Sequence, residues 1–234
     1  MNPELITDNL SYFLFGAWPN GGAMGGLLLT LWMSFVACIL ASILGLAGGI
    51  ALTMGSPGLR AALESAIAVL RGIPVIMLIF WCYFLLPVLF GLNVPGVATV
   101  IAALALINAA YLSQAVRAGL AAIGPGQWHA GLALGLTRWK TLRLVILPQG
   151  LRIMLPSFIN QWVTLIKDTS LAFIVGVPEL TMVSGQVNNR EQVYPLQIYL
   201  FTAILYFLLC AGLSTFARQS ERWWNPRHKG ARHA

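Results

Sequence analysis

Residues Gly126 to Pro156 read GQWHAGLALGLTRWKTLRLVILPQGLRIMLP and form the one long basic segment of a very apolar chain. Gly135 suits the position just after a helix, because glycine adopts the left-handed conformation without a Cβ penalty. Thr137 then stands where an N-cap residue would start a second helix. Pro148 has no N–H and should end that helix. The stretch therefore predicts two short helices, one over Gln127 to Leu134 and an amphipathic one up to Pro148.

This pair of helices has two interpretations. The small residues Ala130, Gly131 and Ala133 would give the first helix a low profile that fits a groove in another protein. Alternatively, the basic second helix would lie on lipid headgroups as an amphipathic surface helix. The pattern alone leaves both interpretations open.

The composition places the chain in a membrane. Of its 234 residues, 58% are hydrophobic and 9% are charged, whereas a soluble domain has about 25% charged residues. No charged residue occurs from Gly25 to Met54, and this run exceeds the ~20 residues that a helix needs to cross a bilayer. The segments of alternating polarity typical of outer-membrane barrels are absent, which favours helices. The predicted fold class is an all-α integral membrane protein.

Five spans are predicted within a single transmembrane domain, residues 1–234. The spans cover residues 24–54, 72–90, 96–117, 153–177 and 192–217. The second and third are joined by a turn at Gly91 to Gly96. The remaining parts are an outer segment at 1–23, a loop at 122–150 and a tail at 218–234.

The charge distribution predicts the topology. The net charge of +7 is compatible with nucleic-acid binding, but the basic residues fall mainly on one side of the five-span arrangement. The positive-inside rule then puts the N-terminus outside, and the loop 122–150 and the tail cytoplasmic. We expect no nucleic-acid partner. Cys38, Cys82 and Cys210 lie inside predicted spans without metal-ligand spacing, so no metal site or disulfide is predicted.

Two spans carry polar residues at helical spacing. In the third span, Asn108 and Gln114 share a face with Tyr111, and this face either holds helices together or lines a pathway. In the fourth span, a polar face is predicted to line the transport path or a gate, and its residues are Asn160, Thr164, Lys167 and Ser170, with Asp168 beside them. Lys167 would either contact substrate or hold a gate closed.

The second crossing begins at Arg71, Gly72, Ile73 and Pro74. Pro74 leaves a backbone carbonyl without its donor, and this predicts a bend in the helix that faces a pore. The alternative is a proline in the first helical turn with a structural role only.

The basic segment resembles a known loop. Gly135, thirteen residues before Pro148 and preceded by Ala130 and Gly131, resembles the "EAA" loop of ABC-transporter permease subunits. The similarity extends over nearly the whole chain and is greatest to the polar amino acid branch of that family. The further matching residues are Arg71 to Pro74, Leu147 to Gln149, Arg152, Leu155, Pro156 and Leu165 to Leu171. Two residues depart from the pattern: His129 replaces the usual glutamate, and Gly131 replaces the second alanine.

The resemblance implies the permease subunit of a type I ABC importer in a bacterial inner membrane, working by alternating access. Its substrate would be a polar amino acid such as glutamate, glutamine or aspartate. The implied partners are ABC ATPase subunits, a second identical or different permease subunit, an external solute-binding protein and membrane lipid. The implied ATPase-coupling residues are Trp128, His129, Ala130, Gly131, Gly135 and Arg138.

Catalysis is not expected in this chain. It lacks the Gly-x-x-x-x-Gly-Lys-Ser/Thr phosphate loop, so ATP and magnesium would bind a partner subunit and this chain would hold no cofactor. An intramembrane enzyme is disfavoured because His129 has no second ligand or nucleophile at suitable spacing. The alternative function is an ion-coupled secondary transporter or channel in which Lys167 and Asp168 relay ions. The lack of visible internal repeats weakens that alternative.

Overall fold

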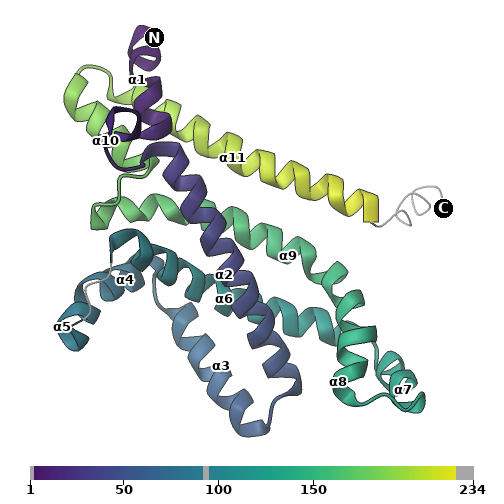
Figure 1. Cartoon of the computed structure of the whole chain (residues 1–234). Helices are drawn as coiled ribbons and strands as arrows, with labels where there is room; N and C mark the ends of the chain where they lie inside the picture. Colours follow the sequence, from purple (N-terminus) through teal and green to yellow (C-terminus); the bar gives the residue numbers. More distant parts are fainter. Residues whose placement is uncertain (1–2, 92–94, 225–234) are drawn as a thin grey trace.

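The computed structural model describes residues 3–91 and 95–224, and within these ranges the chain is built from helices. Four of the described helices are long and apolar enough to cross a membrane, and a bent pair makes a fifth candidate. Figure 1 shows α1 and α10 gathered at one end of the molecule, and α7 and α8 at the other. The predicted fold class, an all-α membrane protein, is confirmed.

Two crossing helices, α2 (Gly26–Met54) and α6 (Gly96–Ala121), form the centre of the core. They approach closely because α2 presents glycines to α6. A Cβ atom added to Gly45 would lie 2.5 Å from the Cβ of Leu112, and one on Gly49 would collide with Val116. Small residues allow such close packing in lipid. The glycines of α2 therefore serve the packing of the two central helices.

The fourth span is longer than the sequence suggested. One helix of 38 residues runs from Arg138 to Val175. It consists of α8 (Arg138–Thr141), a wide π turn η3 (Leu142–Ile146), α9 (Leu147–Asp168) and a 3₁₀ turn η4 (Thr169–Val175). The predicted helix end at Pro148 is therefore wrong, because one helix runs from the loop predicted at 122–150 into the span predicted at 153–177.

Pro148 is accommodated by the wide turn that precedes it. The Leu147 N–H bonds to the carbonyl of Leu142, five residues back, in place of the usual four. Proline cannot donate an α-helical bond and its ring crowds the preceding turn, so a π turn at this point keeps the helix continuous. The same device recurs in the second span, where the Leu86 N–H bonds to Trp81 directly before Pro87.

The second span is bent at its start. Helix α3 (Pro57–Gly72) meets α4 (Val75–Phe80), η2 (Trp81–Leu85) and α5 (Leu86–Phe90) at an angle of 102°. Pro74 is the residue before α4, with an extended backbone at φ −57° and ψ 137°. It is thus neither a kink within a helix nor a first-turn proline, and helix α4 begins at the next residue, Val75.

The outer elements are helical. The predicted segment 1–23 contains α1 (Pro3–Phe15) and η1 (Trp18–Asn20), and the polar stretch before the last span is helix α10 (Leu180–Glu191). Helix α11 (Pro195–Trp224) continues past the predicted span end at 217 into the predicted tail. It packs on α9 and α10, and its C-terminal part projects away from the other helices (Figure 1). The predicted turn at Gly91 to Gly96 lies partly outside the described residues.

Candidate functional site

The loop predicted at 122–150, called the coupling loop below after the role that the resemblance implies, begins with helix α7 (Pro125–Ala133). This helix stops at a glycine, as predicted. Gly135 has φ +76°, and its N–H bonds to the Leu132 carbonyl at 2.9 Å. The Leu136 N–H reaches back to the Gly131 carbonyl at 3.1 Å. The hydroxyl oxygen of Thr137 then accepts the Lys140 N–H at 3.3 Å and starts α8. The left-handed glycine and the threonine N-cap are both confirmed.

Gly131 fixes the packing of α7 on α8. It is buried, and a Cβ atom at this position would lie 2.5 Å from Cγ2 and 2.8 Å from Oγ1 of Thr141. Thr141 is fully buried and donates its hydroxyl proton to the Thr137 carbonyl at 3.0 Å. Glycine at this position therefore gives Thr141 the room it occupies.

The outer face of this loop is small and apolar. His129 and Ala130 are exposed, and the side chain of Leu134 is 82% exposed at the tip beside Gly135. Leu134 was not among the predicted site residues. Its position directly before the glycine that ends the helix was the signal that its side chain would be exposed. Trp128 packs against the core, and Arg138 and His129 both line a hollow between the loop and α2. The loop thus presents a low apolar tip that suits a groove in another protein.

The polar face predicted in the fourth span is present on α9. Asn160, Thr164 and Lys167 are exposed on one side of the helix, and the Thr164 hydroxyl donates to the Asn160 carbonyl at 3.1 Å. Ser170 donates to the Lys167 carbonyl at 2.7 Å, and Asp168 is partly buried. Among the described residues, Lys167 and Asp168 form no ion pair with each other. The ammonium of Lys167 is therefore open to a partner from outside the described chain.

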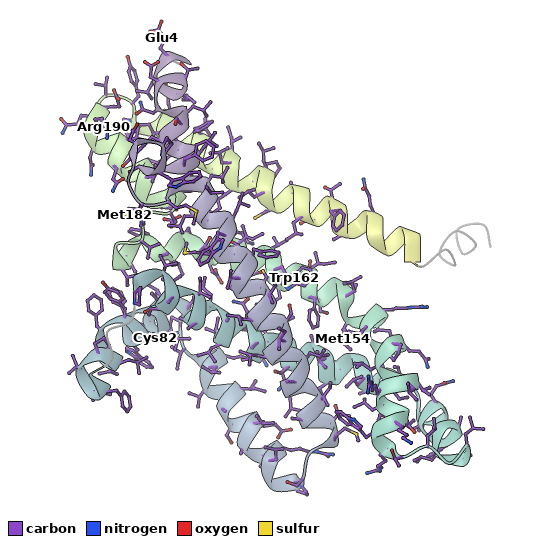
Figure 2. The ribbon with its side chains drawn as sticks, in the orientation of Figure 1. Glu4, Cys82, Met154, Trp162, Met182 and Arg190 are labelled. Atoms are coloured by element: carbon purple, nitrogen blue, oxygen red, sulfur yellow. The ribbon has the colours of Figure 1, made fainter. Side chains whose placement is uncertain are left out.

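The polar residues of the third span do not share one environment. Asn108 is 1% exposed, and its side-chain oxygen accepts an N–H of Gln161 on α9 at 2.6 Å. Asn108 therefore bonds α6 to α9, which agrees with the first of the two roles predicted for this face. Gln114 is half-buried. Nearby, Trp162 of α9 donates its indole N–H to Ser42 of α2 at 3.0 Å, so α9 is bonded to both central helices (Figure 2).

The bend after α3 is held by an aromatic contact. The guanidinium carbon of Arg71 lies 4.9 Å from the centre of the Tyr111 ring on α6, a cation–π geometry. No atom lies within 4 Å of a Cβ added to Gly72, so a larger side chain would fit at this position without a clash. Arg71 and Pro74 thus account for the position of the bend.

A buried carboxyl group joins the outer helices and was missed in the sequence. Glu179 is fully buried, and its carboxylate accepts the N–H groups of Thr181 at 2.8 Å and Met182 at 2.9 Å. It also accepts the hydroxyl of Tyr206 from α11 at 2.8 Å. Burial raises the pKa of Glu179 from 4.5 to about 7, opposed by these hydrogen bonds. Its place before α10 as an N-cap residue was the signal that could have revealed it.

Known proteins resemble the chain over most of its length. Residues 41–226 match the family described as "Binding-protein-dependent transport system inner membrane component". The chain is 36% identical over 198 residues to the glutamine transport system permease protein GlnP of Escherichia coli K12, covering 84% of this chain and 90% of that protein. It is 32% identical over 205 residues to the L-cystine transport system permease protein TcyB of Bacillus subtilis, covering 88% of this chain and 86% of that protein.

A solved structure agrees with these matches. The crystal structure of an amino acid ABC transporter with histidines superposes with a TM-score of 0.77 at 28% identity, and the match covers 84% of this chain and 91% of that one. Membership of one family therefore explains three features together: the helix that ends at Gly135, the small residues packed beside it and the long membrane helices. The chain belongs to the family of inner-membrane permease components of binding-protein-dependent transport systems.

Proposed function

We propose that this chain is the membrane-spanning subunit of an ATP-driven importer for a polar amino acid such as glutamine, glutamate or aspartate. Support for the substrate class comes from relatives named for glutamine, for glutamate and aspartate, and for cystine. The importer would contain two permease subunits, two ATPase subunits on the α7 side and a solute-binding protein on the α10 side. In this topology the N-terminus is outside and α7 is cytoplasmic, in accord with the positive-inside rule.

One observation carries the mechanism. The continuous helix from Arg138 to Val175 connects the projecting α7 loop directly to the exposed polar face of Asn160, Thr164 and Lys167. A displacement of α7 by an ATPase subunit would therefore move this face without an intervening flexible joint. Alternating access follows if the face lines the path between two permease subunits, with ATP chemistry left to the partner.

Uptake by the reconstituted complex tests the proposal. The chain is placed in vesicles with its ATPase and binding protein, with ATP on the α7 side, and uptake of labelled glutamine is measured with competing amino acids. We expect uptake that needs ATP, persists with ionophores, and is reduced by polar amino acids more than by leucine. Uptake that does not require ATP and is lost when ionophores are added would instead identify an ion-coupled transporter.

A further inference from the structure

Two hollows adjoin where α2, α6, α7 and α8 meet. The first has a volume of about 520 Å³, with an apolar floor that includes Leu52 and Leu120. Its rim carries Arg60, Arg117 and Arg138, which come from three different helices. The three charged residues that line this hollow are thus all basic.

The three arginines are not equally satisfied. Arg117 forms an ion pair with Glu64 at 2.5 Å. Arg60 donates to the Thr53 carbonyl at 2.6 Å and keeps its positive charge unpaired by any described acid. The guanidinium group of Arg138 makes neither a hydrogen bond nor an ion pair with the described residues, and only its backbone carbonyl is bonded. Two guanidinium charges in the hollow therefore remain without a counterion from the described chain.

The second hollow is an apolar groove of about 560 Å³ along α2. It is lined by Ile43, Leu46, Ala47 and Ile50, and Trp139 stands at its end. Met54 lines both hollows, and the adjacent residues Arg138 and Trp139 line one each. The basic hollow therefore continues into a groove on a membrane-crossing helix, with a tryptophan where such side chains anchor at the membrane interface.

We propose that the two hollows together bind one anionic phospholipid. Its phosphate lies between Arg60 and Arg138, because guanidinium groups bind phosphate oxygens through paired hydrogen bonds. One acyl chain lies along Ala47 in the α2 groove. An inorganic phosphate would leave the groove unused and an uncharged lipid would leave the arginines unpaired, whereas an anionic lipid matches both. The site faces the anionic cytoplasmic leaflet if the topology proposed above holds.

Lipid retention by the purified full chain tests the site without a partner subunit. The chain is equilibrated in detergent with equal concentrations of phosphatidylglycerol and phosphatidylcholine. The amount of each lipid that stays bound is then measured by native mass spectrometry. We expect preferential retention of phosphatidylglycerol, lowered about five-fold by Arg138→Gln, the effect of one basic residue near a charged membrane surface. The matched control is Arg143→Gln, since Arg143 is exposed outside both hollows. Ala47→Phe, which fills the groove and keeps every charge, should also lower retention.

Four results would overturn the proposal. Equal losses in the Arg138 and Arg143 variants would indicate diffuse surface charge, and full retention in the Ala47 variant would remove the acyl chain from the groove. Displacement of the lipid by glycerol phosphate at equal concentration would identify a site for free anions. Loss of the lipid when the ATPase subunit binds would show that an acidic group of that partner occupies the basic hollow. Unchanged gel filtration of all three variants controls for folding.

Discussion

At the scale of single residues, the coupling loop depends on the fit between Gly131 and Thr141. A methyl group at Gly131 would meet Thr141 at 2.5 Å, so Gly131→Ala should force α7 away from α8 and destabilise the protein by about 1–3 kcal/mol. Thr141→Ala removes the opposing atoms, and the double variant should regain much of the coupled uptake that the single variant loses. Uptake in vesicles measures this, and an equally poor double variant would show that Gly131 matters for another reason.

Gly135 acts through its backbone and not through space. No atom lies within 4 Å of a Cβ built at this residue, but its φ of +76° disfavours a branched side chain. Gly135→Val should therefore reduce transport-coupled ATP hydrolysis while membrane insertion stays normal. Gly124→Val is the matched control, because Gly124 is equally open and has φ −54°. Unchanged coupling in the Gly135 variant would show that the helix break is not required for docking.

Lys167 distinguishes two roles for the polar face of α9. Its exposed ammonium either contacts the carboxylate of the substrate or holds a gate closed against a neighbouring subunit. Lys167→Met keeps the length of the side chain and removes the charge. Raised basal ATPase activity with normal affinity would support the gate, and weakened affinity with a normal basal rate would support substrate contact. Full transport activity in this variant would contradict both roles.

At the scale of elements, Glu179 ties α10 to α11 in a pH-dependent way. Its pKa in the folded protein, about 7, is above the ordinary value of 4.5. The stability it contributes is therefore complete below pH 4.5 and is lost as pH rises through 7. Glu179→Gln, which resembles the protonated form, should make the thermal midpoint in detergent depend less on pH between about 4.5 and 7, because the carboxyl group binds different numbers of protons in the two states over that range.

The matched control for this prediction is Glu4→Gln, on the exposed start of α1 (Figure 2). It should keep the pH dependence of the original chain. If Glu179→Gln also kept that dependence in full, the buried carboxyl group would have no titration linked to folding in this range.

Local signals in the sequence predicted local structure well. Gly135 and Thr137 determine the break between α7 and α8 through their own backbone preferences, and both positions are as expected. The helix end predicted at Pro148 was wrong because a π turn keeps the helix continuous there. The long helix is stabilised along its length by packing on α2 and α6, which the local sequence does not reveal. The angle of 102° after α3 likewise depends on contacts such as that of Arg71 with Tyr111.

Pairings between distant helices could not be predicted from spacing. Asn108 and Tyr111 differ by three residues, which predicts one shared face, yet Asn108 is buried against Gln161 while Tyr111 lies beneath Arg71. The partner of each residue depends on how the helices cross, and the spacing of polar residues along a single helix does not contain that information. Glu179 was missed for the same reason, because its burial depends on α10 and α11.

At the scale of the whole molecule, the single chain leaves two surfaces that suit partners. The apolar tip at Leu134 projects at one end, and the polar face with Lys167 is open along α9. A charged side chain is costly in lipid, so that face requires a second permease subunit or a wet cavity. One long helix joins the two surfaces, so a displacement of the tip would move the polar face with it.

Site-directed cross-linking tests most directly whether α7 meets the ATPase. Cys38, Cys82 and Cys210 are first replaced by alanine, and a single cysteine is introduced as Leu134→Cys on the tip or Asn189→Cys on α10. The assembled complex is then treated with a short bifunctional reagent, with and without ATP. The account predicts a cross-link from position 134 to the ATPase subunit, with a yield that changes with ATP, and none from position 189. A cross-link from position 189, or none from position 134, would contradict it.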